Sequence, residues 1–182
     1  ALPIYPVSMV CANDLFYNCY VFEGSGVETW RLPNLQDANR MFFKCSLFDP
    51  SSVETWNPTM LQSANSMFAG CFAFTGGGLE EWSLPNLRSA THMFFGCIRF
   101  DRISVETWNP TMLQSANFMF AGCIAFTGRG LEEWSLPNLT TATRMFSGCT
   151  GLDLSHLSGW ELPNLEYDGM EAMLAEIGRA HV

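Results

Sequence analysis

A repeat of 26 residues runs through this chain without an insertion or deletion. Its six tryptophans keep the interval from Trp30 to Trp160, and phenylalanine and cysteine keep it in columns that begin at Phe16 and Cys19. Such self-similarity is typical of repeat proteins, in which one unit cannot bury its apolar face alone and stacks against its neighbours. The period therefore predicts one elongated domain of about six coils over residues 1–165, not a globule.

A second period of 52 residues lies on the first. Residues 46–97 and 98–149 match at 41 of 52 positions, which indicates that the array grew by duplication of a two-coil unit. A position that differs between the copies is under weaker constraint from stacking. The differences fall mainly at 46–51, Ser66, Phe72, Gly77, Arg88, Ser89, His92 and Phe95.

One coil shows the predicted elements. Leu131, Trp134 and Leu136 give an LxxWxL pattern like the strand signature of leucine-rich repeats, and a glycine-containing turn precedes it. The apolar spacing over 142–149 fits a short helical or 3-10 segment. We therefore predict a leucine-rich-repeat-like solenoid in which each coil holds a short parallel β-strand and such a segment, with the Trp, Phe and Met columns as its core.

A block of Met, Phe, Gly and Cys returns in fixed register at 67–71, 93–97, 119–123 and 145–149, and 41–45 lacks only its glycine. With the W-x-LPNL run between blocks, this pattern resembles the BspA-like leucine-rich repeat surface proteins from about residue 9 to 165. The 26-residue period is longer than expected for that family, and LPNL replaces a DxSN-like run. The resemblance implies a curved solenoid for surface display, adhesion or protein recognition, an extracellular or cell-surface location, and no catalytic residues.

The polar residues that flank each tryptophan are the candidate partner-binding site. On the predicted strand they would point outward and form one mildly acidic face, the kind of face on which repeat proteins bind partners. We expect a non-enzymatic recognition or adhesion module for a protein or glycan, or alternatively a structural spacer. The predicted partner-binding residues are Thr29, Arg31, Thr55, Asn57, Glu81, Ser83, Thr107, Asn109, Glu133 and Ser135.

A column of glutamates directly before these positions allows a third function. Stacked carboxylates repel one another, so solvent, backbone N–H groups or a cation must offset the repulsion. Calcium prefers several converging oxygens to a single file, so a weak calcium-binding module is the lesser alternative. The residues concerned are Glu28, Glu54, Glu80, Glu106 and Glu132.

Other sites find little support in the sequence. The sequence has no CxxC pair and no histidine column, so the cysteines do not predict a zinc site. For the cysteine column, buried free thiols are favoured over disulfides between coils. Cys11 lies outside this column and is expected to be an exposed thiol. His92, His156 and His181 share no repeat position, and no catalytic or phosphate-binding motif is present, so we expect no enzyme and no cofactor.

Charge and the chain ends complete the expectations. With 9 Lys and Arg against 18 Asp and Glu the chain has a net charge of −9, which argues against nucleic-acid binding, and no apolar run is long enough for membrane insertion. We expect a monomeric fragment that begins within a longer array. Residues 166–182 are expected to be either a capping helix around Met170, Met173, Leu174 and Ile177 or a non-native tail, because 176–182 match a translated sequencing adapter.

Overall fold

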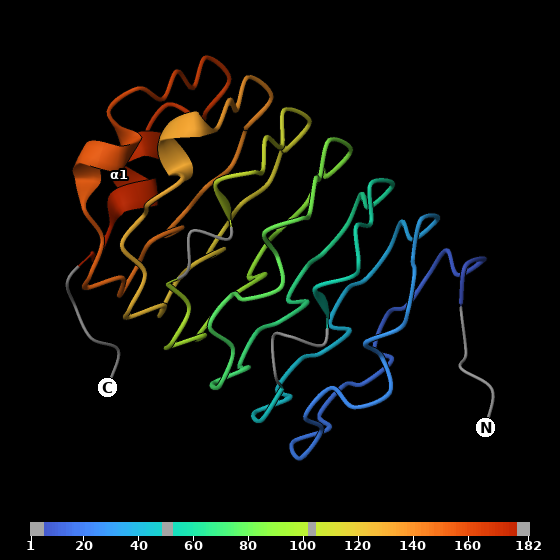
Figure 1. The fold of residues 1–182 in the computed structure, drawn as a ribbon. Coiled ribbons are helices and arrows are strands. Elements are labelled where there is room, and N and C mark those ends of the chain that lie inside the picture. Colours follow the sequence, from blue (N-terminus) through green and yellow to red (C-terminus); the bar gives the residue numbers. More distant parts are fainter. Residues whose placement is uncertain (1–5, 49–52, 102–104, 178–182) are drawn as a thin grey trace.

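The computed structural model describes residues 6–48, 53–101 and 105–177 as a stack of irregular coils (Figure 1). Successive coils lie side by side from the N-terminal to the C-terminal end of the picture. The helices whose bounds lie within the described residues are all in the C-terminal third of the chain. They are the 3-10 helices η3 (Leu131–Glu133) and η4 (Leu154–Leu157) and the α-helix α1 (Gly169–Leu174). Isolated parallel bridges join neighbouring coils at one repeat position: Cys11–Asp37, Asp37–Ser63, Ser63–Ser89, Ser89–Ser115 and Ser115–Thr141.

The predicted leucine-rich-repeat-like solenoid, with a parallel β-strand in each coil, is wrong. The described residues contain no β-strand, and the bridges between coils stay single and form no sheet. At the predicted strand, Leu131 instead begins η3, and the N–H of Trp134 donates to the carbonyl of Leu131 at 3.1 Å. Residues three apart lie on opposite faces of a strand, whereas the same spacing closes a tight turn, and here the turn forms and satisfies the tryptophan N–H within the coil.

The segment predicted as helical is a run of tight turns that carries the hydrogen bonds between coils. The N–H groups of Phe118 and Phe120 donate to carbonyls of the next coil at 2.9 Å, whereas those of Met119 and Ala121 donate three residues back within their own coil. Phe118 has a φ of 55°, and Gly122, further along the same segment, has a φ of 77°. These left-handed residues prevent a continuous helix and aim every second N–H at the neighbour.

The large apolar columns form the core, as the sequence predicts. Phe42, Phe68 and Phe94 are fully buried, and phenylalanine rings of adjacent coils stack with centroids 5.3–5.8 Å apart. The tryptophan rings also stack, and each indole N–H from Trp56 onward donates to a carbonyl 29 residues earlier, as Trp82 does to Val53 at 3.3 Å. One coil therefore completes the core and the hydrogen bonding of the next.

The C-terminal end of the stack is covered by α1 and the residues after it. The N–H of Arg144 donates to Ala172 O at 2.7 Å and that of Gly148 to Glu176 O at 3.0 Å, where inner coils would meet another coil. A short helix lies within the segment for which a capping helix was one alternative: Met173 is buried, but Met170 is exposed and the helix ends at Leu174. Of the proposed non-native tail, residues 178–182 lie outside the described part.

The indole hydrogen bond generates a test of this packing. Trp82→Phe removes the donor to Val53 and part of a fully buried ring, so we expect the free energy of unfolding to fall by about 2 kcal/mol. Urea denaturation would measure the change. Trp30→Phe is the matched control, because Trp30 is only partly buried and its indole donates to no described carbonyl; an equal loss in both variants would contradict the ladder.

Candidate functional site

The polar row predicted from the sequence lies on the surface. All ten of its side chains are exposed, whereas Trp56, Trp82 and Trp108 between them are fully buried. The structure therefore places these polar groups on a common exposed side of the stack without the β-sheet that we expected. We call these ten residues, from Thr29 to Ser135, the polar row.

Hydrogen bonds between coils hold much of the polar row in place. The hydroxyl of Thr55 donates to the carbonyl of Glu28 at 2.7 Å, and the side-chain oxygen of Asn57 accepts the N–H of Ser83 at 3.0 Å. The later copies repeat both contacts, as in Asn109, which accepts from Ser135. The row is thus continuous from coil to coil, and part of its polarity is already used by the backbone.

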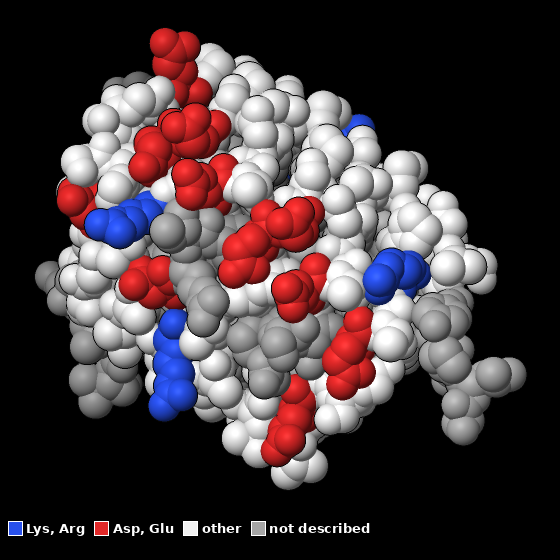
Figure 2. All heavy atoms as spheres, in the orientation of Figure 1, with Lys and Arg blue, Asp and Glu red and all other residues white. Residues whose placement is uncertain are grey.

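The carboxylates of Glu81 and Glu133 have no such role. Within the described residues neither carboxylate makes a hydrogen bond or an ion pair, and both side chains are exposed. They occupy the same repeat position 52 residues apart. Figure 2 shows one face of the molecule on which acidic side chains spread over several coils with few basic ones among them. These two carboxylates are therefore open to a partner.

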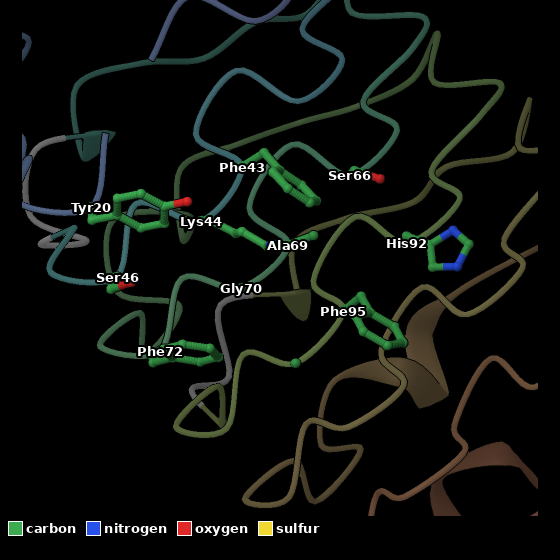
Figure 3. A pocket seen from close by; sticks show the side chains of 11 residues that line it. Tyr20, Phe43, Lys44, Ser46, Ser66, Ala69, Gly70, Phe72, His92 and Phe95 are labelled. Carbon is green, nitrogen blue, oxygen red and sulfur yellow. The ribbon is translucent and has the colours of Figure 1, made fainter. Parts of the chain in front are cut away.

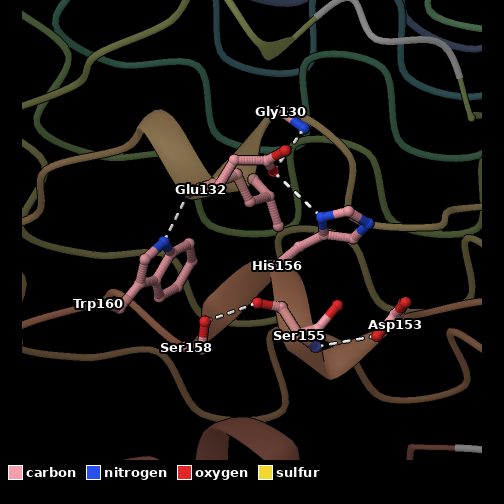
Figure 4. Close-up of polar contacts among 8 residues, drawn as sticks. Gly130, Glu132, Asp153, Ser155, His156, Ser158 and Trp160 are labelled. Carbon is pink, nitrogen blue, oxygen red and sulfur yellow. Dashed lines mark hydrogen bonds and ion pairs between the residues drawn. The ribbon is translucent and has the colours of Figure 1, made fainter.

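The glutamate column is partly engaged by the backbone. Glu28 accepts the N–H of Gly26 at 2.7 Å, and Glu132 accepts that of Gly130 at 2.9 Å and lies 3.3 Å from Nδ1 of His156 (Figure 4). The part of the chain that the structure describes holds no group of three or more His, Cys, Asp or Glu arranged for a metal ion. Backbone N–H groups therefore supply some of the compensation that the calcium hypothesis assigned to a cation.

Helix η4 fixes the position of His156 beside this column. The Asp153 carboxylate accepts the N–H of Ser155 at 2.9 Å, and this hydrogen bond lowers the pKa of Asp153. The hydroxyl of Ser158 donates to the carbonyl of Ser155 at 2.8 Å, and the indole of Trp160 donates to Leu131 O at 2.7 Å (Figure 4). These contacts tie the last coil to η3 and make a structural join, not a reactive centre.

A second candidate surface is an open groove with aromatic walls that the sequence did not reveal. It has a volume of about 630 Å³, and the rings of Tyr20, Phe43, Phe72 and Phe95 line it (Figure 3). Tyr20, Phe72 and Phe95 are 54%, 50% and 41% exposed, unusually high fractions for large aromatic side chains. Lys44, Ser46, Ser66, Ala69, Gly70, His92 and Gly96 complete the lining, which we call the aromatic groove.

Contacts around the aromatic groove order two of its polar side chains. The ammonium of Lys44 lies 5.3 Å from the centre of the Phe43 ring, close enough for a cation–π interaction. The ring of His92 stacks on Phe118 at 4.8 Å, and burial lowers the pKa of His92. His92 is therefore uncharged at neutral pH, and among the described residues Lys44 is the one cation that lines the groove.

The duplicated sequence did carry a signal for the aromatic groove. The two 52-residue copies differ at 11 positions, namely 46, 47, 50, 51, 66, 72, 77, 88, 89, 92 and 95. Five of these line the groove: Ser46, Ser66, Phe72, His92 and Phe95. Weak constraint from stacking explains why they could vary, but only the structure shows that they meet on one surface.

The cysteine column is structural. All seven cysteines are free; Cys11 is exposed, as predicted, and so is Cys19, whereas the other five are buried. Each buried thiol donates to a phenylalanine carbonyl of the preceding coil, as Cys97 does to Phe68 O at 3.1 Å. Burial raises the pKa of Cys45, Cys97 and Cys149 to about 12, so these thiols stay protonated and unreactive at neutral pH.

Comparison with known sequences agrees with the repeat architecture. The profile of a family described as "Mycoplasma protein of unknown function, DUF285" matches residues 10–127 and 65–180. The chain belongs to the DUF285 family. This confirms the resemblance to a repeat family but not the narrower one to BspA-like leucine-rich repeat proteins. No curated protein matches the chain. Among the described residues, no helix has the length and apolarity to cross a membrane.

The raised thiol pKa values predict a loss of stability in alkali. Cys97 keeps its proton to about pH 12 when folded but has an ordinary pKa of 9.0, so its contribution is complete below pH 9.0 and is lost as the pH rises toward 12. We expect the Tm to fall as the pH rises from about 9 toward about 12. The fall should be smaller in Cys97→Ala and unchanged in Cys11→Ala; the same fall in all three proteins would contradict this origin.

Proposed function

We propose that this DUF285 chain is a non-enzymatic recognition module that works at a surface and binds a protein or glycan through the polar row. The observation that carries the proposal is the row itself. It sets exposed polar side chains at the two repeat positions beside each tryptophan in successive coils, and hydrogen bonds between the coils fix their spacing. A row that is already ordered loses little conformational freedom when a partner binds, which favours affinity.

The charge of this surface favours a partner with a cationic patch. Seven of the eighteen acidic residues stand immediately before the tryptophans, in or beside the polar row. Glu81 and Glu133, which have no partner within the described residues, are free to pair with such a patch. Complementary charge would raise the rate of association most strongly at low salt.

A spacer is the second candidate function, and the regularity of the stack favours it. The same side-chain and backbone hydrogen bonds return in coil after coil, so the chain can hold other segments apart without binding anything. The calcium alternative has less support, because Glu28 and Glu132 already accept backbone N–H groups. A spacer would be indifferent to changes at exposed side chains of the polar row.

Paired charge reversal separates recognition from spacing. Glu81→Lys with Glu133→Lys should lower binding to glycans and purified surface proteins on an array by about tenfold or more, because both carboxylates would become repulsive to a cationic patch. The melting temperature should stay within about 2 °C of the original, since exposed substitutions change stability little. Array binding and thermal melting would be measured on the same preparations.

Glu23→Lys with Glu166→Lys is the matched control. Both residues are exposed, neither belongs to the polar row, and the change in net charge is the same. We expect this variant to bind like the original chain. Equal losses in both double variants would show a general effect of charge, and no array ligand for the original chain would favour the spacer.

A further inference from the structure

The aromatic groove is a second recognition site, separate from the polar row. We propose that it binds an extended peptide segment that carries an aromatic or large aliphatic side chain next to a carboxylate. None of the ten residues of the polar row lines the groove. The inference therefore goes beyond the proposed function, and it is tested with different residues.

The apolar part of this specificity comes from four rings that the core does not use. Phe42, Phe68 and Phe94 are buried in the core stack. Tyr20, Phe43, Phe72 and Phe95 do not belong to that stack and line the groove instead (Figure 3). Exposed rings gathered around one concavity leave apolar surface in contact with water. A ligand side chain of similar character would remove that surface from water, which is the usual source of affinity in such grooves.

The charged part of the specificity comes from Lys44. It is the single lysine of the chain, and none of the acidic residues that the structure describes lines the groove. Within the described residues the Lys44 ammonium has no carboxylate partner, and its only charge-related contact is the face of Phe43. A ligand carboxylate could accept a charge-assisted hydrogen bond from the Lys44 ammonium, beside apolar rings that exclude water.

The glycine at position 70 keeps this arrangement open. Gly70 has a φ of 75°, and a side-chain carbon added there would approach Cγ of Lys44 to 3.1 Å. The missing side chain lets the aliphatic part of Lys44 lie against the backbone, and the end of the side chain then reaches Phe43. The left-handed turn of this coil therefore helps to place the cation at the wall of the groove.

A peptide fits this lining better than a glycan. Three of the four rings are phenylalanines, which offer no hydrogen-bonding group, and the remaining polar side chains are Ser46, Ser66, Lys44 and the neutral His92. A sugar carries a hydroxyl on almost every carbon and would leave many of them without a partner in such a groove. A peptide with one apolar side chain and one carboxylate leaves few polar groups unpaired.

The second copy of the two-coil unit supplies an internal control. There Phe118, Ile124, Arg144 and Ser147 stand where the first copy has Ser66, Phe72, His92 and Phe95. Phe118 stacks on His92, and Ser147 is fully buried, so the same coil geometry is compatible with either set. Substitutions that install the second copy's residues are therefore accepted by the fold and should remove the groove.

The test is selection of random heptapeptides displayed on phage against the purified full chain, followed by fluorescence anisotropy with the selected peptide. We expect enriched sequences to place Phe, Tyr, Trp, Leu or Ile next to Asp or Glu. Phe72→Ile with Phe95→Ser should weaken binding by about tenfold or more. Lys44→Gln should weaken it by about fivefold, and replacement of the peptide's acid by its amide should have no further effect in that variant.

Two further variants separate peptide binding in the groove from binding elsewhere on the chain. Ile124→Ser, at the repeat position of Phe72 but outside the groove, should leave the anisotropy titration unchanged, and circular dichroism would confirm that each variant is folded. Glu81→Lys with Glu133→Lys should also leave it unchanged, so failure here and failure of the polar row are distinguishable. The proposal is overturned by an absence of enrichment, by a consensus without an acid, by equal binding in the groove variants, or by glycan binding that Phe72→Ile with Phe95→Ser abolishes.

Discussion

The hydrogen bonds between coils are the constraint on which the rest of the structure depends. In the turn segment every second N–H donates to the next coil, and the intervening ones close turns within their own coil. A backbone with so little regular secondary structure stays ordered only if each coil meets a matching neighbour at the same register. An inserted residue would shift every later donor, which explains why the 26-residue period has no insertion or deletion.

The side-chain columns follow from the same register. Tryptophan N–H groups and cysteine thiols both reach carbonyls 29 residues earlier, so each of these side chains packs in the core and also satisfies the backbone of the preceding coil. From the second coil onward, this double role explains why no other residue type replaces Trp or Cys at its position. Burial in this core also raises the pKa of the thiols, which keeps them protonated and unreactive at neutral pH.

The exposed positions are released from that constraint, and there the two halves of the array differ. The polar row keeps Glu81 and Glu133 in both copies, whereas five lining residues of the aromatic groove in one copy are replaced in the other. One regular scaffold can in this way carry a repeated surface and a unique one. The two surfaces also differ in chemistry, since the first is acidic and the second is apolar with Lys44 at its wall.

The sequence by itself determined the number of coils, the core columns, the exposure of all ten residues of the polar row and that of Cys11, because a strict period leaves one set of side chains to stack. It did not determine how each coil runs. In LxxWxL only Trp134 and Leu136 have the spacing of two that a strand face requires, and the tertiary structure showed that the segment from Leu131 to Trp134 forms a turn, in which the tryptophan N–H is satisfied inside its own coil. The aromatic groove also needed the tertiary structure, since Tyr20 and Phe95 come to line one groove only when coils far apart in sequence are stacked.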